Sequence, residues 1–125
     1  MYEVGKYRVV FKIQGIGEAQ GELIRRKSPL TAESVWRAIP ITGRASVWRN
    51  AEVYFPAGVK RGLERATRTV EVGDIAHWPL GDAICVFYDK VEPYSDVNII
   101  GRILDGLSVF GKVKLGTTIT LDKLT

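Results

Sequence analysis

The alternation of apolar and polar residues near the start of the chain is typical of a half-buried strand. Residues 7–13 place apolar side chains at every odd position and basic ones at positions 8 and 12. A turn containing Gly15 and Gly17 follows, and a second strand is expected around residues 22–25. These two segments predict a hairpin, which ends at a run of three basic residues, 25–27.

A change of period predicts one main helix over residues 31–39. The apolar positions spaced as on one helix face are Ala32, Val35, Trp36 and Ile39. Thr31 is the expected N-cap, because its hydroxyl can accept a hydrogen bond from an amide of the first turn. Pro40 is expected to end the helix, because proline disfavours helical backbone in the residue before it.

The rest of the chain is predicted to be mostly strand. Short strands are expected at residues 44–49, 52–55, 69–72, 75–78, 83–88, 97–104, 113–115 and 119–124. Residues 56–68 are rich in Lys and Arg and are expected to form an exposed loop. Closely spaced short strands with little helix favour a closed β-barrel or a sandwich, since closure removes exposed sheet edges. We therefore predict one mainly β domain over residues 1–125.

The composition is typical of a globular protein, and the charge is distributed unevenly along the chain. With 125 residues, 46% apolar and 26% charged, the chain is long enough to bury a core, which excludes a disordered or collagen-like protein. The net charge of +4 divides into +7 for residues 1–68 and −3 for residues 69–125, which raises nucleic acid as a partner. With no N-terminal apolar run and no long apolar stretch, a cytoplasmic domain without a membrane span is expected.

Cysteine and histidine usage limits the chemistry. Cys85 and His77 are the only residues of their types, so an intrachain disulfide, a paired-cysteine metal site and a multi-histidine metal site are excluded. We expect no metal and no cofactor. Cys85 lies in an apolar strand, which favours a small buried side chain over a nucleophile paired with His77. The glycines at 15, 17 and 21 favour a hairpin turn over a phosphate loop, because a strand and not a helix follows them.

A set of basic residues in two loops is the candidate for phosphate contacts. It comprises Arg25, Arg26, Lys27, Lys60, Arg61, Arg65 and Arg68. No aromatic residue is interleaved with them to stack on bases, and Glu64 lies among them. The pattern favours a solvated basic surface over a nucleic-acid site.

Aromatic residues on several predicted strands form the most informative group. The expected members of a cleft are Trp48, Tyr54, Phe55, Trp78 and Phe87. Arg44 and Arg49 lie beside them, and aromatic rings with a guanidinium suit a cleft for a peptide or a planar ligand. The alternative is that these aromatic residues belong to the core.

Several segments resemble a family of small prokaryotic cyclophilin-like proteins of largely uncharacterised function. Residues 73–79, 83–88 and 97–103 carry the resemblance, and residues 31–40 and 48–55 fit the same family. The similarity extends from about residue 7 to residue 124. It implies a closed eight-stranded antiparallel barrel with one main helix over about 31–39 and a short second helical segment.

The resemblance also suggests what the cleft does. Phe87 falls on a cleft phenylalanine of the cyclophilin prolyl isomerases, and Arg49 with Tyr54 is the candidate for their arginine–aromatic pair. The cleft histidine of those enzymes falls on Val97, and an alanine–asparagine pair of their substrate wall falls on Trp78-Pro79. The resemblance therefore implies a cleft whose wall differs from that of an isomerase.

Three functional hypotheses follow. The first is a domain that binds a peptide segment or small ligand in an aromatic cleft, with weak or no isomerase activity. The alternative is a peptidyl-prolyl isomerase in which Arg49 or Arg44 donates a hydrogen bond to the prolyl nitrogen. That donor would favour the twisted amide and lower a barrier of about 18–20 kcal/mol. The third hypothesis is nucleic-acid binding through the basic loops.

Overall fold

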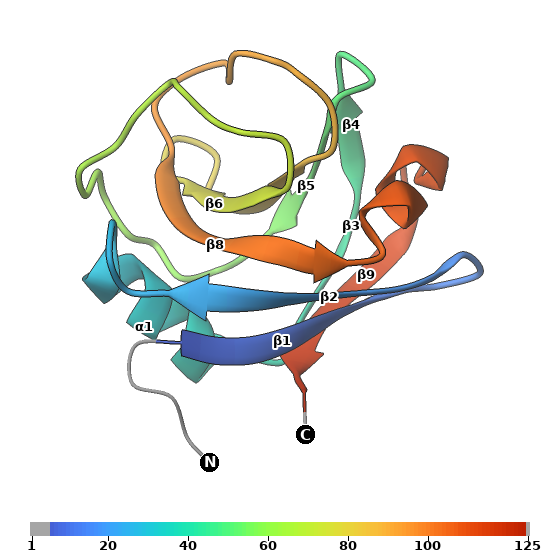
Figure 1. The fold of residues 1–125 in the computed structure, drawn as a ribbon, viewed down its shortest axis with the longest axis horizontal. Helices are drawn as coiled ribbons and strands as arrows, with labels where there is room; N and C mark the ends of the chain where they lie inside the picture. Colours follow the sequence, from blue (N-terminus) through green and yellow to red (C-terminus); the bar gives the residue numbers. More distant parts are fainter. Residues whose placement is uncertain (1–5, 125) are drawn as a thin grey trace.

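The computed structural model describes residues 6–124, in which nine strands form one antiparallel sheet accompanied by two helices (Figure 1). The strands are β1 (Lys6–Ile13), β2 (Gly17–Ile24), β3 (Ile41–Arg44), β4 (Ser46–Trp48), β5 (Glu52–Pro56), β6 (Asp74–Trp78), β7 (Ala83–Phe87), β8 (Asn98–Asp105) and β9 (Thr118–Lys123). The helices are α1 (Pro29–Ala38) and the 3-10 helix η1 (Leu107–Lys112). Neither helix is long and apolar enough to cross a membrane.

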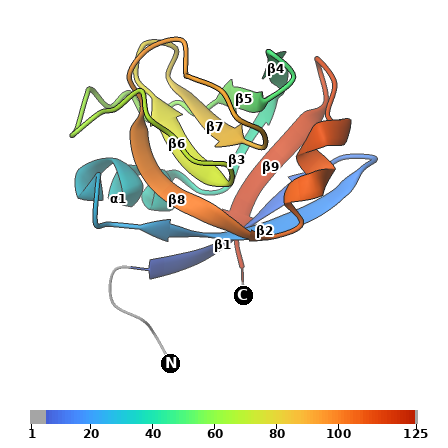
Figure 2. The ribbon, with the colours of Figure 1, turned by 45° about the horizontal axis from the view of Figure 1, so that its top comes forward.

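The sheet curls until its two ends nearly meet, as Figure 2 shows. Its strand order is β3-β9-β1-β2-β8-β6-β7-β5-β4. At the seam, Gly43 of β3 lies against β5, and a Cβ added to it would stand 3.1 Å from Cδ of Pro56. The missing side chain therefore lets β3 approach β5 closely. The result is a nearly closed barrel of the predicted class, with nine strands where eight were predicted.

Aromatic rings from distant parts of the chain fill the barrel interior. Phe11 of β1 packs edge to face against Phe55 of β5 and Phe110 of η1, with ring centroids 6.4 and 5.5 Å apart. All three are fully buried. The odd positions of β1 therefore face the core, as the alternation predicts.

Two predicted strands are absent, and a third is divided. Residues 69–72 form no strand, because both edges of the nearest strand, β6, are already paired with β7 and β8. Residues 113–115 follow η1 directly and lead into the turn before β9. The alternation over 44–49 belongs to β3 and β4, which are separate because Ala45 bonds to Thr117 and Gly116 between them.

Helix α1 begins two residues earlier than predicted and receives its cap from another segment. Ser28 is the N-cap residue, and Thr31 is the third residue of the helix, so the prediction of Thr31 as N-cap is wrong. The amides of Leu30 and Thr31 donate to the Glu64 carboxylate at 3.0 and 2.8 Å. A residue 33 positions further along therefore satisfies the first turn of the helix.

Glu64 also joins α1 to the barrel. Its amide donates to Oδ1 of Asn98 at 2.8 Å, and Nδ2 of Asn98 donates to the carbonyl of Gly62 at 2.8 Å. Ser28 donates its hydroxyl to the Glu64 carbonyl at 2.9 Å. Ser28 and Asn98 are fully buried, so this network is the polar joint between α1, the 57–66 loop and β8.

Glu64 should stabilise the fold most strongly when it is ionised. Partial desolvation opposes the charge, but hydrogen bonds from Leu30 and Thr31 and the charge of Arg61 outweigh it, so the pKa of Glu64 lies below 4.5. A carboxylate whose pKa is lowered by folding stabilises the protein above its unfolded pKa, and this stabilisation is lost as pH falls through the folded pKa.

Glu64→Gln is therefore expected to lower the free energy of unfolding by roughly 1–2 kcal/mol at pH 7. Urea unfolding at pH 7 and pH 3 should show the difference from the wild type shrinking at the lower pH. Glu18→Gln, at an exposed position of β2, is the matched control and should change little at either pH. A Glu64→Gln effect that is equal at both pH values would contradict this role of the charge.

Candidate ligand-binding pocket

Strands β5, β6 and β7 bury side chains on both faces of the sheet. Along these strands, Val53, Ile75 and Val86 belong to the core inside the barrel. The neighbouring positions, represented by Ala76 and Cys85, belong to a second apolar cluster. Because side chains alternate across a strand, this second cluster lies on the outer face of the barrel wall.

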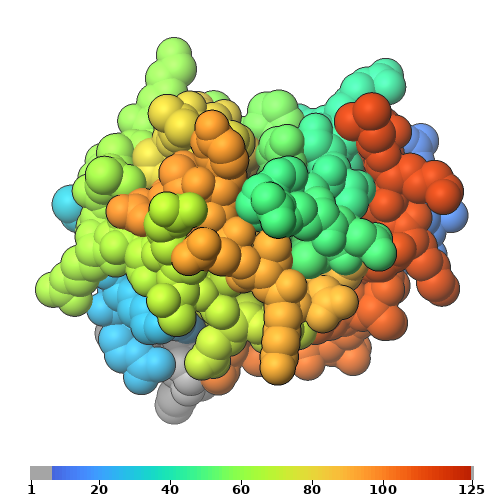
Figure 3. Space-filling view, turned by 90° about the horizontal axis from the view of Figure 1, so that it is seen from above, coloured from blue at the N-terminus to red at the C-terminus, as the bar shows by residue number. Residues whose placement is uncertain are grey.

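Two segments partly cover this outer face. The chain runs across it in residues 67–70 and again in residues 91–97, and the two are joined by paired backbone hydrogen bonds between Thr67 and Val97, both 2.9 Å. Figure 3 looks onto this face and shows the golden to orange segment that ends near residue 97 beside the green hairpin of β4 and β5.

Arg68 holds the second covering segment. Its Nη2 donates to the carbonyl of Tyr94 at 3.3 Å and to that of Pro93 at 3.5 Å, and it lies 3.7 Å from a carboxylate oxygen of Glu92. The ion pair with Glu92 is exposed and contributes little by itself. The bonds to two consecutive carbonyls fix the path of the segment.

Between the covering segment and the strands lies an open pocket of about 150 Å³. Its lining residues are Trp48, Glu52, Tyr54, Trp78, Pro93, Tyr94 and Val97. We call it the aromatic pocket, because its walls are the rings of Trp48, Tyr54, Trp78 and Tyr94.

The four rings form a chain of edge-to-face contacts. Tyr54 and Trp78 have centroids 5.8 Å apart, Trp78 and Tyr94 6.1 Å, and Tyr94 and Trp48 6.4 Å. The planes of each pair stand at 79–90° to one another. The indole Nε1 of Trp78 donates to Oγ of Ser95 at 2.6 Å, which fixes its orientation. This bond and the edge-to-face contacts hold the rings in this arrangement.

Among the residues that the structure describes, Glu52 is the one acidic side chain lining this pocket. It is the first residue of β5, pairs with Phe87 of β7, and is 6% exposed. Burial raises the pKa of Glu52, and a hydrogen bond with the Cys85 thiol offsets part of that rise. Among residues 7–124, no cationic side chain forms an ion pair with it. The pocket therefore combines aromatic walls with a buried carboxyl group.

Cys85 and His77, whose orientation the sequence leaves open, lie on different faces. Cys85 is on the outer face beside Glu52, and burial together with the Glu52 charge raises the pKa of its thiol well above 9.0. A thiol of this kind is a poor nucleophile. His77 alternates with Trp78 and so points away from the aromatic pocket.

His77 has a structural partner on its own side of the sheet. Its Nε2 lies 2.9 Å from Oδ1 of Asp82, which also accepts the Lys60 amide at 3.1 Å. Burial lowers the pKa of His77, although Asp82 opposes this. The pair therefore ties the 57–66 loop to the turn between β6 and β7.

The structure brings together some of the residues that the sequence predicts for the cleft. Trp48, Tyr54 and Trp78 all line the aromatic pocket. Phe55 and Phe87 do not line the pocket, because both are fully buried, Phe55 in the first apolar cluster and Phe87 in the second. For these two residues the structure agrees with the alternative that the aromatic residues belong to the core.

The two arginines predicted as donors lie in different places. The Arg49 guanidinium stacks over the ring of Trp48, with its Cζ 4.7 Å from the centroid. Arg44 is an exposed residue of β3 opposite Thr118 on β9 and lines no part of the pocket.

Sequence reasoning missed Glu52 and Tyr94. Glu52 could have been found, because it stands two residues before Tyr54 on one strand and therefore shares its face. Tyr94 lies in a segment without periodicity, and no local pattern places it near Trp48.

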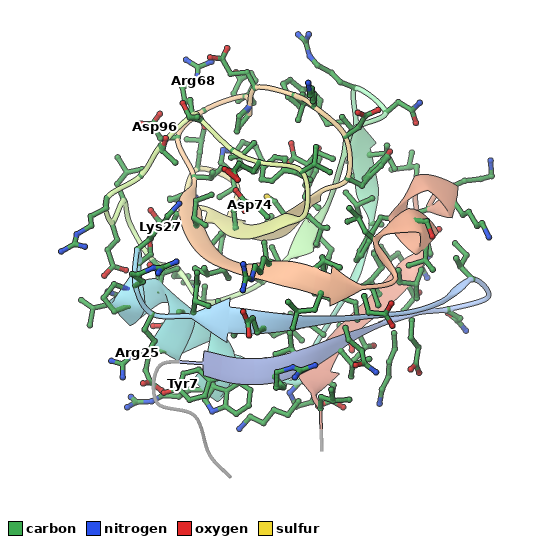
Figure 4. All side chains as sticks on the ribbon, viewed as in Figure 1. Tyr7, Arg25, Lys27, Arg68, Asp74 and Asp96 are labelled. Carbon is green, nitrogen blue, oxygen red and sulfur yellow. The ribbon has the colours of Figure 1, made fainter. Side chains whose placement is uncertain are left out.

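The basic loops are interspersed with acidic residues from the second half of the chain. Figure 4 shows Arg68 beside Asp96 on one part of the surface and Arg25 near Tyr7 on another. Arg25 also lies 4.0 Å from Glu33, and Lys27 is close enough to Asp74 to lower its pKa, although burial, the larger effect, raises it overall. At Arg68 and at Lys27, positive charge from the first part of the chain therefore lies beside negative charge from the second part.

A family model described as Cyclophilin-like matches residues 7–122. The solution structure of the hypothetical protein AF2241 from Archaeoglobus fulgidus is 31% identical, with a TM-score of 0.80 over 99% of this chain and 100% of that one. The structure of McbB in complex with tryptophan is 12% identical, with a TM-score of 0.77 over 92% of this chain and 44% of McbB, and shares the fold. Comparison with curated proteins finds no match.

Substitution of Arg68, which donates to the carbonyls of Pro93 and Tyr94, should loosen the covering segment without unfolding the barrel. In Arg68→Gln, amide hydrogen exchange at Thr67 and Val97, the hydrogen-bonded pair that joins the two covering segments, should rise by about fivefold or more, because the bonds to two carbonyls of the neighbouring segment are lost. The free energy of unfolding should change by less than about 0.5 kcal/mol. Arg65→Gln, in the same loop, is the control and should leave exchange in this segment unchanged. Unaltered exchange in Arg68→Gln would show that the segment holds its path without Arg68.

Proposed function

We propose that this chain, which belongs to the cyclophilin-like family, is a binding domain. Its aromatic pocket takes a small ligand or one side chain of a peptide segment. The observation that carries the proposal is the open pocket walled by Trp48, Tyr54, Trp78 and Tyr94. A concave site with mostly aromatic walls and one polar group is typical of ligand recognition.

The pocket's position on the fold supports the same function. The outer face of β5, β6 and β7 is apolar, and the covering segment leaves part of it open beside Tyr94, which is 65% exposed. Ordered aromatic rings lose little conformational freedom when a ligand binds, so even a small contact area can give useful affinity. McbB shows that the same fold occurs in a protein solved with tryptophan bound.

The arrangement of arginines favours binding over prolyl isomerisation. Isomerisation requires a donor aimed at the prolyl nitrogen, which becomes more basic as the amide twists. Arg49 instead stacks on Trp48, and Arg44 lines no part of the pocket. The position that carries the cleft histidine in isomerases is occupied by Val97, which has no polar group to offer. The proposed domain therefore has weak or no isomerase activity.

Ligand binding can be read from the tryptophan side chains. A screen of small aromatic and cationic fragments by NMR should shift the indole Nε1–H signals of Trp48 and Trp78. Trp36 stacks on Tyr7 with centroids 4.6 Å apart, away from the pocket, and its indole should stay constant. Tyr94→Ala should weaken binding by about tenfold, since a contacting ring is lost.

Leu115→Ala, at an 81% exposed position outside the pocket, is the matched control for Tyr94→Ala and should bind as the wild type does. A coupled peptide isomerisation assay should in parallel give a rate close to the uncatalysed background. Catalysis well above background that disappears in Arg49→Ala would contradict the binding proposal and support an isomerase.

A further inference from the structure

We propose that the ligand of the aromatic pocket carries a methylated ammonium group, which binds between the aromatic rings beside Glu52, and an anionic group, which binds at the adjacent basic rim. This inference rests on the proposed function and names the chemical class of the ligand. The anion is a carboxylate or a phosphate.

The rings themselves favour a cation. The face of an aromatic ring carries partial negative charge, and several rings set at right angles attract a cation from more than one side. Arg49 already illustrates this preference, because its guanidinium lies over the Trp48 ring. It does so from the neighbouring hollow, and it does not line the aromatic pocket.

Glu52 adds a formal negative charge to the attraction. A buried carboxylate without a cationic partner is costly, and an ammonium group in the pocket would supply that partner. Burial also raises the pKa of Glu52, which reflects the same cost. Ligand binding would therefore offset the cost of burying the Glu52 carboxylate.

The mostly aromatic lining favours a methylated ammonium over a primary one. A primary ammonium carries three N–H donors that need acceptors once water is removed. Among the described residues of the lining, the side-chain acceptors are the Glu52 carboxylate and the hydroxyls of Tyr54 and Tyr94, and Nε1 of Trp78 is a donor already bonded to Ser95. Methyl groups need no acceptor and pack against ring faces. The volume of about 150 Å³ suits a compact head, since an engineered cavity of about that size accepts benzene.

The basic residues at the rim of the pocket favour a negative charge on the same ligand. The hollow next to the pocket shares Trp48, Pro93 and Tyr94 with it and is lined by three basic residues, Arg49, Arg68 and Lys90, against one acidic residue, Glu92. A simple cation would be repelled there. A zwitterion matches both charges, with its ammonium at Glu52 and its anion at the rim.

Four small compounds separate the two charges. Glycine betaine carries both, choline carries only the cation, 3,3-dimethylbutanoate only the anion, and 3,3-dimethyl-1-butanol neither, while all four share a head of similar shape. Titrations followed at the indoles of Trp48 and Trp78 should place glycine betaine tightest, at least about tenfold tighter than 3,3-dimethylbutanoate. Phosphocholine, titrated alongside, reports whether a phosphate on a longer spacer is preferred to the carboxylate.

Variants then assign each charge to a residue. Glu52→Gln should reduce the advantage of glycine betaine over 3,3-dimethylbutanoate, to the part that the rings alone supply. Arg49→Gln should reduce the advantage over choline of the tighter of glycine betaine and phosphocholine, to the part that Arg68 and Lys90 supply. Arg49→Lys keeps the charge and should retain most of that advantage. Because the four-compound comparison is complete in the wild type, the test does not depend on the folding of a variant.

Each result has a distinct consequence. If 3,3-dimethyl-1-butanol binds the pocket as tightly as glycine betaine, the charge inference is wrong while the binding function stands. If choline binds as tightly as glycine betaine and phosphocholine, the basic rim does not contribute to binding, and the inference of a zwitterionic ligand is wrong. If none of the compounds shifts Trp48 or Trp78, the inference is wrong, and the fragment screen decides the proposed function separately.

Discussion

The burial of both faces of β5, β6 and β7 is the constraint on which the rest of this structure depends. One face closes the barrel core around residues such as Val53 and Ile75, so the strands are fixed in register by apolar packing. The other face is then determined, because the residues between them must point outward. Glu52, Tyr54 and Trp78 therefore have their positions imposed by the core behind them.

A covered outer face needs a covering segment, and here the cover is held by polar contacts. Arg68 bonds to the carbonyls of Pro93 and Tyr94, while Glu64 and Asn98 fasten the preceding loop to α1 and β8. Apolar contacts hold the cover as well, since Val97 is buried in the second apolar cluster and Val91 packs against that cluster. The aromatic pocket lies between this segment and the strands.

The sequence predicted what alternation governs and missed what long-range polar contacts govern. The strand around Phe11 follows from alternation, while the strands around Val86 and Ile100 follow from short apolar runs between turn residues. Together they predict the barrel, and Trp48, Tyr54 and Trp78 were found as aromatic strand residues. Phe55 and Phe87 share that pattern but occupy the core, since composition alone does not tell a pocket wall from a buried ring. Capping of α1 by Glu64 and the contribution of Tyr94 depend on loops, where no local period reports the partner.

The most direct test of the central claim, that the open outer face is a ligand site selecting a methylated ammonium, is a nuclear Overhauser measurement on the protein with glycine betaine. We expect contacts from the ligand methyl protons to ring protons of Trp48, Trp78 and Tyr94. Contacts confined to Trp36 and Tyr7, or their complete absence at saturating ligand, would contradict it.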